Sequence, residues 1–470
     1  MLTVTARGLK AKLPDWRHAN GPGYRALADR IRLLIVDGRL APGTRLPAER
    51  ELAAELGVSR TTIAAAYAAL RDDAFIESLR GSGSVTRLPV REWGSMDPDE
   101  GLIDLSRAAM PPIPRLTDAM RAGLELLPSV LGDTGFDPIG RPELRQAIAD
   151  RYTSRGLPTG PEQIMVTIGA QHAIALLART VLGRGDRVLI EHPTYPNAID
   201  ALAAAGGRLI PTTVDPEGRW DLPGLEQAVA KGSPALAYLM PDNHNPTGAT
   251  LPTEQLVDAL AIAAAHGTVV IVDETMGELT IDGPTRMPAA AYGPAVLVGS
   301  VGKTVWGGVR VGWIRAEPAF IQKLVRARFA SDLGTPALEQ LAVSTLLADF
   351  DDVLAERIAW LREGRDHLLA ELAVRFPEWS VPVPHGGLTA WVGIDRPVSS
   401  QLALAARAGG LAITAGPRFA VDGSFERFLR IPYSRGPEYT DRALDVLESA
   451  WAAVQGDAVR MPDDAFTAVA

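Results

Sequence analysis

Apolar residues recur every three or four positions in three stretches of the first 90 residues, which is the spacing of amphipathic helices. The stretches are residues 24–36, 49–56 and 60–70. Gly57 follows the second stretch, as glycine commonly follows a helix C-terminus, and Ser59 is placed to cap the third. We therefore predict three helices, the second and third of which are joined by a Gly-Val-Ser turn.

Two short strands are predicted after the third helix, at residues 74–78 and 84–88. The sequence Leu-Arg-Gly-Ser-Gly between them is typical of a hairpin tip. Two helices, a short turn and a hairpin predict a winged helix-turn-helix, whose last helix enters the major groove of DNA with its N-terminus. Hydroxyl and guanidinium groups at and around that N-terminus can meet bases and phosphates, and they belong to Ser59, Arg60, Thr61, Thr62, Arg45, Arg50 and Arg80. A small helical domain with merely solvated arginines is the alternative.

The rest of the chain alternates strand-like and helical stretches, which predicts an α/β domain with a largely parallel sheet. The expected strands are residues 164–168, 187–190, 235–239, 268–272, 295–298 and 312–315. Prolines and glycines without periodicity before this domain indicate a linker. We therefore predict a DNA-binding domain at 20–88, a linker at 89–103, the α/β domain at 104–452 and a tail at 453–470.

Charge and composition narrow the possible functions. Residues 1–88 hold 14 basic and 9 acidic side chains, whereas the remainder holds 33 and 47, so nucleic acid is expected to bind the N-terminal part. The chain has no cysteine, which excludes disulfides and thiolate chemistry, and we expect no metal. It shows neither a secretory signal nor an uninterrupted apolar run of about 18 residues, so a cytoplasmic protein without membrane contact is expected.

Three side chains of the α/β domain suggest cofactor chemistry when they are taken together. Lys303 lies in a Ser/Gly-rich turn after a predicted strand, where a lysine of lowered pKa can form an aldimine with an aldehyde cofactor. Asp273 can keep a pyridine nitrogen of that cofactor protonated, and Asn245 can hydrogen-bond its phenolic oxygen. Singly, they would be a surface lysine, a helix cap and a turn residue.

Further residues are suited to hold a phosphate and an aromatic ring. Ser300 and Arg310 flank the lysine turn and can converge on a phosphate. Ala170 and Gln171 open a helix directly after a strand, where backbone N–H groups form an anion site. Tyr195 offers an aromatic face on which the cofactor ring can stack.

The N-terminal segment from residue 38 to residue 87 strongly resembles the DNA-binding domain of the GntR superfamily of bacterial regulators. The resemblance implies contacts with double-stranded DNA from Arg50, Arg60, Thr61, Thr62 and Gly81. Relatives often carry a further basic residue one turn later, where this chain has Ala64, so a contact is expected to be missing there.

Residues from about 104 to about 452 resemble fold-type I enzymes of the aspartate aminotransferase type, which use pyridoxal 5′-phosphate (PLP). The resemblance implies that Lys303 carries PLP, that Asp273 pairs with its pyridinium and that Asn245 meets its phenolic oxygen. It also implies a phosphate site and a homodimer with the active site between subunits. Arg430 matches the arginine that binds a substrate carboxylate, and the implied phosphate ligands are Ala170, Gln171, Ser300 and Arg310.

Two departures from the aminotransferase pattern remove phenol groups. Thr275 and Met276 stand where a tyrosine follows the pyridinium-pairing aspartate, and Phe136 stands where a phosphate-binding tyrosine is common. Losing these hydroxyls should weaken cofactor tuning and proton transfer more than cofactor capture. The pattern therefore favours sensing over turnover.

The fusion of the two domains resembles the MocR family of regulators, also called GabR-type. That resemblance implies a transcription regulator in which PLP, alone or with an amino compound, changes the affinity for DNA. Two alternatives stay open. One is a working aminotransferase with a DNA-binding module, and the other is a DNA-binding protein whose second domain has lost its cofactor.

Overall fold

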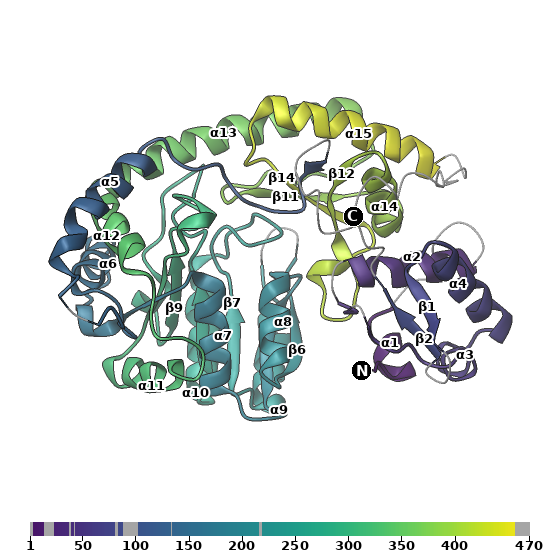
Figure 1. The fold of residues 1–470 in the computed structure, drawn as a ribbon, viewed down its shortest axis with the longest axis horizontal. Helices are drawn as coiled ribbons and strands as arrows, with labels where there is room; N and C mark the ends of the chain where they lie inside the picture. The colour runs from purple at the N-terminus through teal and green to yellow at the C-terminus, as the bar shows by residue number, and fades with distance from the viewer. Residues whose placement is uncertain are drawn as a thin grey trace.

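The computed structural model describes residues 3–13, 23–36, 39–41, 43–79, 83–87, 102–132, 134–215 and 219–455. They form a small N-terminal domain and a larger α/β domain, which lie side by side (Figure 1). Nearly all of the predicted linker, most of the predicted tail, Arg80 and Gly81 lie outside the described residues. Within the described ranges, every helix is too short or too polar to cross a lipid bilayer.

The N-terminal domain confirms the three predicted helices and the hairpin. A cluster of buried leucines and isoleucines from these helices forms a core of its own. Gly57 adopts φ 64° at the end of the second helix, a left-handed conformation that favours glycine. Ala74 was predicted to begin a strand, but it has φ 58° in the turn before that strand. The elements are α1 (Ala6–Lys10), α2 (Gly23–Val36), α3 (Glu49–Leu56), α4 (Arg60–Asp72), β1 (Ile76–Leu79) and β2 (Gly83–Thr86).

The α/β domain is built on a seven-stranded sheet of order β4-β10-β9-β8-β7-β5-β6. All neighbours are parallel except β10, which is antiparallel to both β4 and β9. The six predicted strands are present, but β6 was not predicted, because its half-exposed sequence with Pro211 lacks a clear pattern and lies at the sheet edge. The strands are β4 (Ile164–Thr167), β5 (Arg187–His192), β6 (Arg208–Thr213), β7 (Leu236–Leu239), β8 (Val269–Asp273), β9 (Val296–Ser300) and β10 (Gly312–Arg315).

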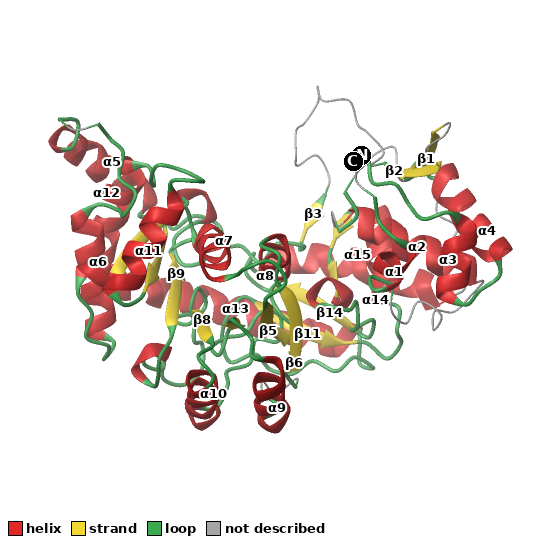
Figure 2. Ribbon diagram, turned by 90° about the horizontal axis from the view of Figure 1, so that it is seen from below, coloured by secondary structure: helices red, strands yellow, loops and turns green. Residues whose placement is uncertain are grey.

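Helices cover both faces of this sheet (Figure 2). Side chains alternate between the faces of a strand, so Val188 and Ile190 join one apolar cluster and Leu189 joins the other. The first cluster includes α7 (Ala170–Val181), α8 (Pro196–Ala204) and α11 (Pro318–Arg328). The second includes α6 (Pro142–Ser154), α9 (Leu222–Gly232) and α10 (Thr253–Ala265). Helices α5 (Leu116–Leu126) and α12 (Ala337–Leu346) pack together at the end of the domain (Figure 1).

The C-terminal part forms a smaller lobe, which the sequence pattern did not separate from the rest. A long helix, α13 (Phe350–Arg375), leads into it (Figure 1). Its three-stranded antiparallel sheet contains β11 (Thr389–Gly393), β14 (Phe428–Pro432) and β13 (Thr414–Ala415). Strand β12 (Leu411–Ala412) pairs in parallel with β3 (Ile103–Asp104), and the lobe also contains α14 (Ser399–Ala408) and α15 (Pro437–Gln455).

Candidate cofactor pocket and DNA-binding face

The predicted cofactor residues follow the carboxyl ends of neighbouring strands. Asp273 ends β8, Tyr195 follows β5, and Lys303 lies in the turn after β9. Because the carboxyl ends of parallel strands lie at one edge of the sheet, these side chains meet there. Arg430 comes from β14 of the C-terminal lobe, so the group of candidate cofactor residues, which we call the cofactor pocket, lies between that lobe and the sheet.

Lys303 has the properties of a nucleophilic amine. Its Nζ donates a hydrogen bond to the Ala108 carbonyl, and the side chain is partly buried. Burial, together with the nearby guanidinium groups of Arg430 and Arg310, lowers the pKa of Lys303 to about 8. The negative charge of Asp273 acts in the opposite direction and raises this pKa. The neutral, nucleophilic fraction of the amine near neutral pH is therefore much larger than for an exposed lysine, which suits reaction with an aldehyde.

Asp273 is held by two hydroxyl groups that the sequence reasoning did not assign to it. The phenol of Tyr238, on β7, donates to Oδ2 over 2.7 Å, and the Thr275 hydroxyl donates to Oδ1. The Thr275 backbone N–H also donates to Oδ1 over 2.9 Å. Thr275 therefore orients the carboxylate, although it was singled out only for the phenol it lacks. A tyrosine within an otherwise apolar buried strand was the signal for Tyr238.

The turn before α7 provides the predicted anion site. The Arg310 guanidinium donates to the Ile168 carbonyl over 3.0 Å, which places it beside Gly169 and the first turn of α7. Ser300 Oγ donates to the Val311 carbonyl over 3.0 Å. Arg310 and the N-terminal N–H groups of α7 thus surround one location suited to a phosphate. The Gln171 side chain donates to the Asn197 carbonyl, so Gln171 faces α8 with its amide and offers its backbone N–H to this location.

Glycines keep this location open. A Cβ on Gly312 would lie 2.6 Å from the carbonyl carbon of Gly169 and 2.8 Å from the Ala170 nitrogen. A Cβ on Gly169, which has φ 81°, would lie 2.7 Å from an Arg310 nitrogen. Both positions therefore require glycine for the backbone and the guanidinium to approach this closely.

Buried polar atoms without a protein partner line the remainder of the pocket. Among the described residues, neither the buried Asn245 Oδ1 nor the buried Arg430 Nε has a hydrogen-bond partner. An orphaned polar atom of this kind indicates a ligand group or water. Tyr195 is held by a hydrogen bond of 3.0 Å from Asn197, and burial raises the pKa of its phenol, as does the negative charge of Asp273.

Arg430 is buried behind the candidate ring site. Its guanidinium donates to the Ser106 carbonyl and lies 5.0 Å from the centre of the Phe419 ring. Burial lowers the pKa of Arg430 to about 10, although Tyr195 raises it, so the group is positively charged at neutral pH. A buried cation with a free donor suits a carboxylate, and together with the amine, the glycine-lined anion site and the orphaned amide it fits PLP bearing an amino compound.

The DNA-binding face is exposed and compact. Ser59 Oγ accepts a hydrogen bond of 3.1 Å from the Thr62 N–H and caps α4, as predicted. The Arg60 side chain is 72% exposed, with its Nε 3.6 Å from a carboxylate oxygen of Glu49. The other predicted contact residues that the structure describes, Thr61, Arg45 and Arg50, are also exposed.

Comparison with known families assigns both parts of the chain. Residues 111–447 match the model of aminotransferase class I and II. The chain belongs to that aminotransferase family. Residues 23–86 match the model of bacterial regulatory proteins of the gntR family. The chain therefore combines a GntR-type helix-turn-helix domain with a PLP-binding aminotransferase domain, which is the architecture of MocR-type regulators.

Individual relatives agree with this assignment. The chain is 28% identical to the HTH-type transcriptional regulator TauR of Rhodobacter capsulatus, over 88% of this chain and 93% of TauR. It is 29% identical to the probable rhizopine catabolism regulatory protein MocR of Rhizobium meliloti, over 71% and 72%. The structure of LysN, an α-aminoadipate aminotransferase of Thermus thermophilus complexed with N-(5′-phosphopyridoxyl)-L-leucine, superposes with a TM-score of 0.69 and 28% identity, covering 76% of this chain and 94% of LysN.

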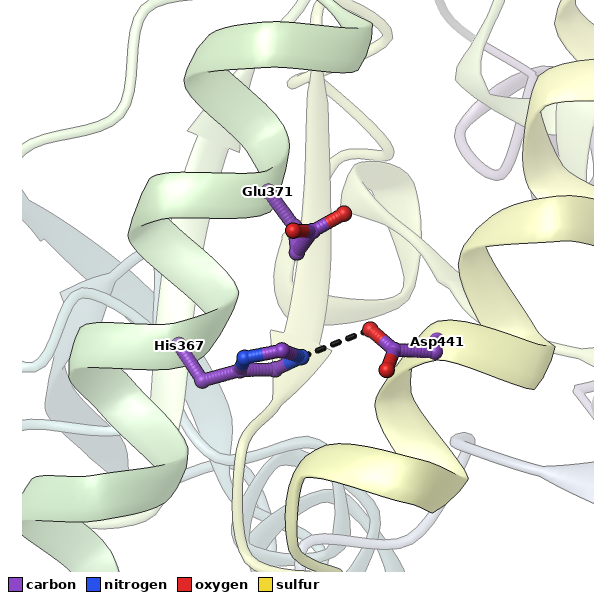
Figure 3. Close-up of side chains that lie close together, drawn as sticks. All are labelled: His367, Glu371 and Asp441. Carbon is purple, nitrogen blue, oxygen red and sulfur yellow. Dashed lines mark hydrogen bonds and ion pairs between the residues drawn. The ribbon is translucent and has the colours of Figure 1, made fainter.

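A second polar cluster lies between α13 and α15 (Figure 3). His367, Glu371 and Asp441 each point one potential metal-ligand atom toward the others, within 4.8 Å. However, His367 Nε2 lies 2.6 Å from an Asp441 oxygen, and Glu371 accepts a hydrogen bond of 2.9 Å from Arg375. Arg375 also bonds Asp445 of α15 over 2.6 Å. Protein partners thus engage these side chains, and the cluster joins the two helices as an ion-pair network.

Proposed function

We propose that the chain is a PLP-dependent transcription regulator in which the state of the cofactor pocket controls DNA binding. The observation that carries the proposal is one chain holding both an exposed recognition-helix N-terminus and a full set of cofactor-suited residues around Lys303. The names of TauR, which matches 88% of this chain, and of MocR, which matches 71%, support the regulatory part.

The residues of the pocket have separate proposed tasks toward PLP. When bound, PLP supplies an aldehyde that reacts with amines and a pyridinium ring that accepts electrons. Lys303 offers the amine, and Asp273, oriented by Tyr238 and Thr275, faces the ring nitrogen. Asn245 would hydrogen-bond the phenolic oxygen, and Tyr195 would offer its aromatic face to the ring. The phosphate is held by Arg310, Ser300 and the start of α7 at Ala170 and Gln171.

The same pocket is better suited to sensing than to sustained transamination. Thr275 bonds Asp273 with its hydroxyl, and Met276 is buried without a hydroxyl, so neither replaces the missing phenol. Phe136 also lacks one. We propose that Arg430 binds the carboxylate of an amino compound that acts as effector together with PLP. Sustained turnover above about 1 per second would instead favour an enzyme.

A homodimer is part of the proposal. Leu131 and Phe136 are 69% and 68% exposed, and Phe329 and Leu333 are also exposed. A backbone bridge between Asp137 and Gly334 brings the segment that carries Phe136 beside the segment that carries Leu333. Exposed apolar surface of this kind is typical of an interface, and a second copy of the chain is the expected partner. A DNA-binding regulator of this type is expected in the cytoplasm.

The test is fluorescence anisotropy with a DNA duplex from upstream of the gene for this chain. Apo and PLP-loaded protein are compared, with and without a panel of amino acids. We expect PLP, alone or with an amino acid, to change the dissociation constant for DNA. Equal affinity in all states would contradict the proposed function.

A further inference from the structure

The N-terminal domain is attached to the large domain through α2, on the side away from the recognition helix (Figure 1). Arg30 of α2 is 2% exposed. Its guanidinium donates to Ser400 Oγ over 2.6 Å, to the Gly423 carbonyl over 2.6 Å and to a carboxylate oxygen of Glu426. The next turn of α2 places Leu33 in the apolar core of the large domain. The contact is therefore a buried ion pair beside apolar packing.

Glu426 links Arg30 to the structure of the large domain. One Glu426 oxygen accepts the Ser400 N–H over 3.0 Å and the Ser399 hydroxyl over 2.9 Å, so Glu426 also caps the first turn of α14. A second arginine, Arg39, lies after the end of α2 and donates to the Pro417 carbonyl over 3.0 Å. Both arginines thus bind the segment formed by residues 416–428, which we call the coupling segment.

The coupling segment also contacts the cofactor pocket, through the backbone and the side chain of Phe419. The Phe419 carbonyl accepts a hydrogen bond of 3.0 Å from the Thr194 N–H, directly before Tyr195. The Phe419 ring lies under the guanidinium of Arg430. A group that enters the pocket and moves Tyr195 or Arg430 therefore acts on Phe419, two residues from the Pro417 carbonyl that Arg39 binds.

A further contact joins the coupling segment to the end of β5. His192 Nε2 lies 3.2 Å from an Asp422 oxygen, and its ring lies 4.7 Å from the Phe425 ring. The hydrogen bond from His192 lowers the pKa of Asp422, so its carboxylate is charged. Phe425 has φ 74°, which is strained for a residue other than glycine and shows that surrounding contacts fix this turn. Glu426 follows it directly.

Within the N-terminal domain, α2 is connected to the recognition helix. Arg32, two residues after Arg30, forms ion pairs with Asp29 of α2 and with Asp73, the C-cap of α4. Its guanidinium also lies 5.5 Å from the centre of the Phe75 ring. Helix α2 therefore has one side on the coupling segment and the other on α4.

We propose that residues 416–428 couple the cofactor pocket to the DNA-binding domain, and that Arg30 and Glu426 are positioning residues that hold this domain in its docked orientation. The proposal rests on the proposed function and adds its structural route. Pocket groups bias the coupling segment through Phe419, and the end of β5 acts on it through Asp422. The segment holds or releases the DNA-binding domain through Glu426, which binds Arg30, and through the Pro417 carbonyl, which binds Arg39. Because the Arg30–Glu426 pair is buried, neutralising one partner leaves the other charge uncompensated, which favours release.

The first test compares coupling in wild type, Arg30→Gln and Glu426→Gln. The dissociation constant for the upstream duplex is measured without ligand, with PLP, and with PLP plus L-alanine, L-glutamate or L-lysine as neutral, acidic and basic probes. In wild type, the ligand-dependent change is expected to be roughly 5- to 150-fold, and in both variants it should fall to about twofold or less. Arg39→Gln, which removes one contact, should give an intermediate value. Arg208→Gln, an exposed arginine on the sheet edge strand β6, should behave as wild type.

The uptake of PLP, followed by absorbance, separates a positioning role from a merely structural one. It should be unchanged in all four variants, because none of these residues belongs to the pocket. If Arg30→Gln does not fold, Glu426→Gln and Arg39→Gln carry the test. Full coupling in the folded variants would overturn the role of the coupling segment and leave the proposed function standing. A wild type that does not respond to PLP or to any probe would overturn both.

A distance measurement in the absence of DNA tests whether the N-terminal domain is docked on the large domain. Because the chain has no cysteine, spin labels can be placed at Ala54→Cys on α3 and Ala370→Cys on α13, which are both exposed. Dilution with unlabelled protein isolates distances within one chain. We expect a narrow distribution in apo wild type, a shifted one with the ligand that changes DNA affinity, and a broad one in Arg30→Gln with or without ligand. A distribution in Arg30→Gln identical to that of wild type would contradict the inference.

Discussion

The cofactor pocket and the DNA-binding face both consist of polar side chains, but these are held in opposite ways. In the pocket, Lys303, Asp273 and Arg430 come from three different strands or turns, and protein groups fix each of them by hydrogen bonds. On the DNA-binding face, the groups from Ser59 to Thr62 lie within one turn and are largely exposed. The pocket is organised before its ligand arrives, whereas the face leaves its side chains in water.

This difference sets how much a single residue can change. Burial disfavours the charged form of a group, as the lowered pKa values of Lys303 and Arg430 show, and it also strengthens the interactions between neighbouring charges. Exposed charges are screened, and an exposed ion pair contributes about 0–1 kcal/mol. Substitutions in the pocket should therefore abolish or greatly weaken binding, whereas those on the face should change it in small steps.

The largest effect is expected for Lys303→Ala. The variant lacks the amine that forms a covalent bond with the aldehyde, so PLP should no longer be captured and should pass through a desalting column separately from the protein. Lys323→Ala, a variant of another of the five lysines, should retain PLP. Absorbance after desalting measures both. Retention of PLP by Lys303→Ala would show that the pocket does not depend on this lysine and would break the comparison.

Capture of PLP by wild type should depend strongly on pH. Burial lowers the pKa of Lys303 to about 8, so the neutral and reactive fraction of the amine rises as pH increases and levels off above pH 8. Well below that pKa the neutral fraction changes about tenfold per pH unit, and at the pKa it reaches one half, so the initial capture rate should rise roughly 50-fold from pH 6 to pH 8. Stopped-flow absorbance gives the rate. A rate that still rises tenfold per unit between pH 8 and pH 10 would place the lysine in water, like the side chains of the DNA-binding face.

A substitution in the anion site should have a smaller effect. In Gly312→Ala, the added Cβ meets the backbone at Gly169 and Ala170, which must move. Forcing an extra carbon into a packed site costs about 1–3 kcal/mol, so PLP affinity should fall roughly 5- to 150-fold. Gly307→Ala is the matched control, because its Cβ would have 3.8 Å to its nearest neighbour. Equal PLP affinities by equilibrium titration would contradict a tight phosphate site at this glycine.

The same contrast explains what the sequence could predict about the fold. Helices α3 and α4 were predicted with their turn, because Gly57 and Ser59 act on their immediate neighbours. Strand β6 was missed, and so was the separate C-terminal lobe with its short strands β12 and β13, each of two residues. Such strands are specified by partners distant in the chain, as β12 is by β3, and not by a local pattern.

In the candidate site, too, residues within local motifs could be predicted, whereas contacts between distant parts of the chain could not. The motifs around Asn245, Asp273 and Lys303 indicated the cofactor chemistry, and the family comparison shows a PLP-binding domain. The contact of Tyr238 with Asp273 was not predictable, although a tyrosine in an apolar strand stood out, because it depends on the pairing of β7 with β8. The contact of Arg30 with Glu426 joins residues 396 positions apart, so no local pattern could indicate it.

The smallest expected effect concerns Glu49 on the DNA-binding face. Its carboxylate lies 3.6 Å from Arg60 and competes with DNA phosphates for this guanidinium. Glu49→Gln removes the competitor and one negative charge facing DNA. Because an exposed pair of this kind contributes at most about 1 kcal/mol, DNA affinity should rise by a factor of roughly two to five.

A matched control for this change is Glu51, which lies in the same helix turn. Glu51→Gln removes an equal charge from the first turn of α3, but Glu51 forms no ion pair with Arg60 among the described contacts, so it corrects for the general loss of negative charge. Anisotropy at two salt concentrations measures both variants, since screening reduces such effects. In an Arg60→Ala background the specific gain from Glu49→Gln should vanish. If the gain persists there, Glu49 acts on DNA directly and Arg60 is not the group it restrains.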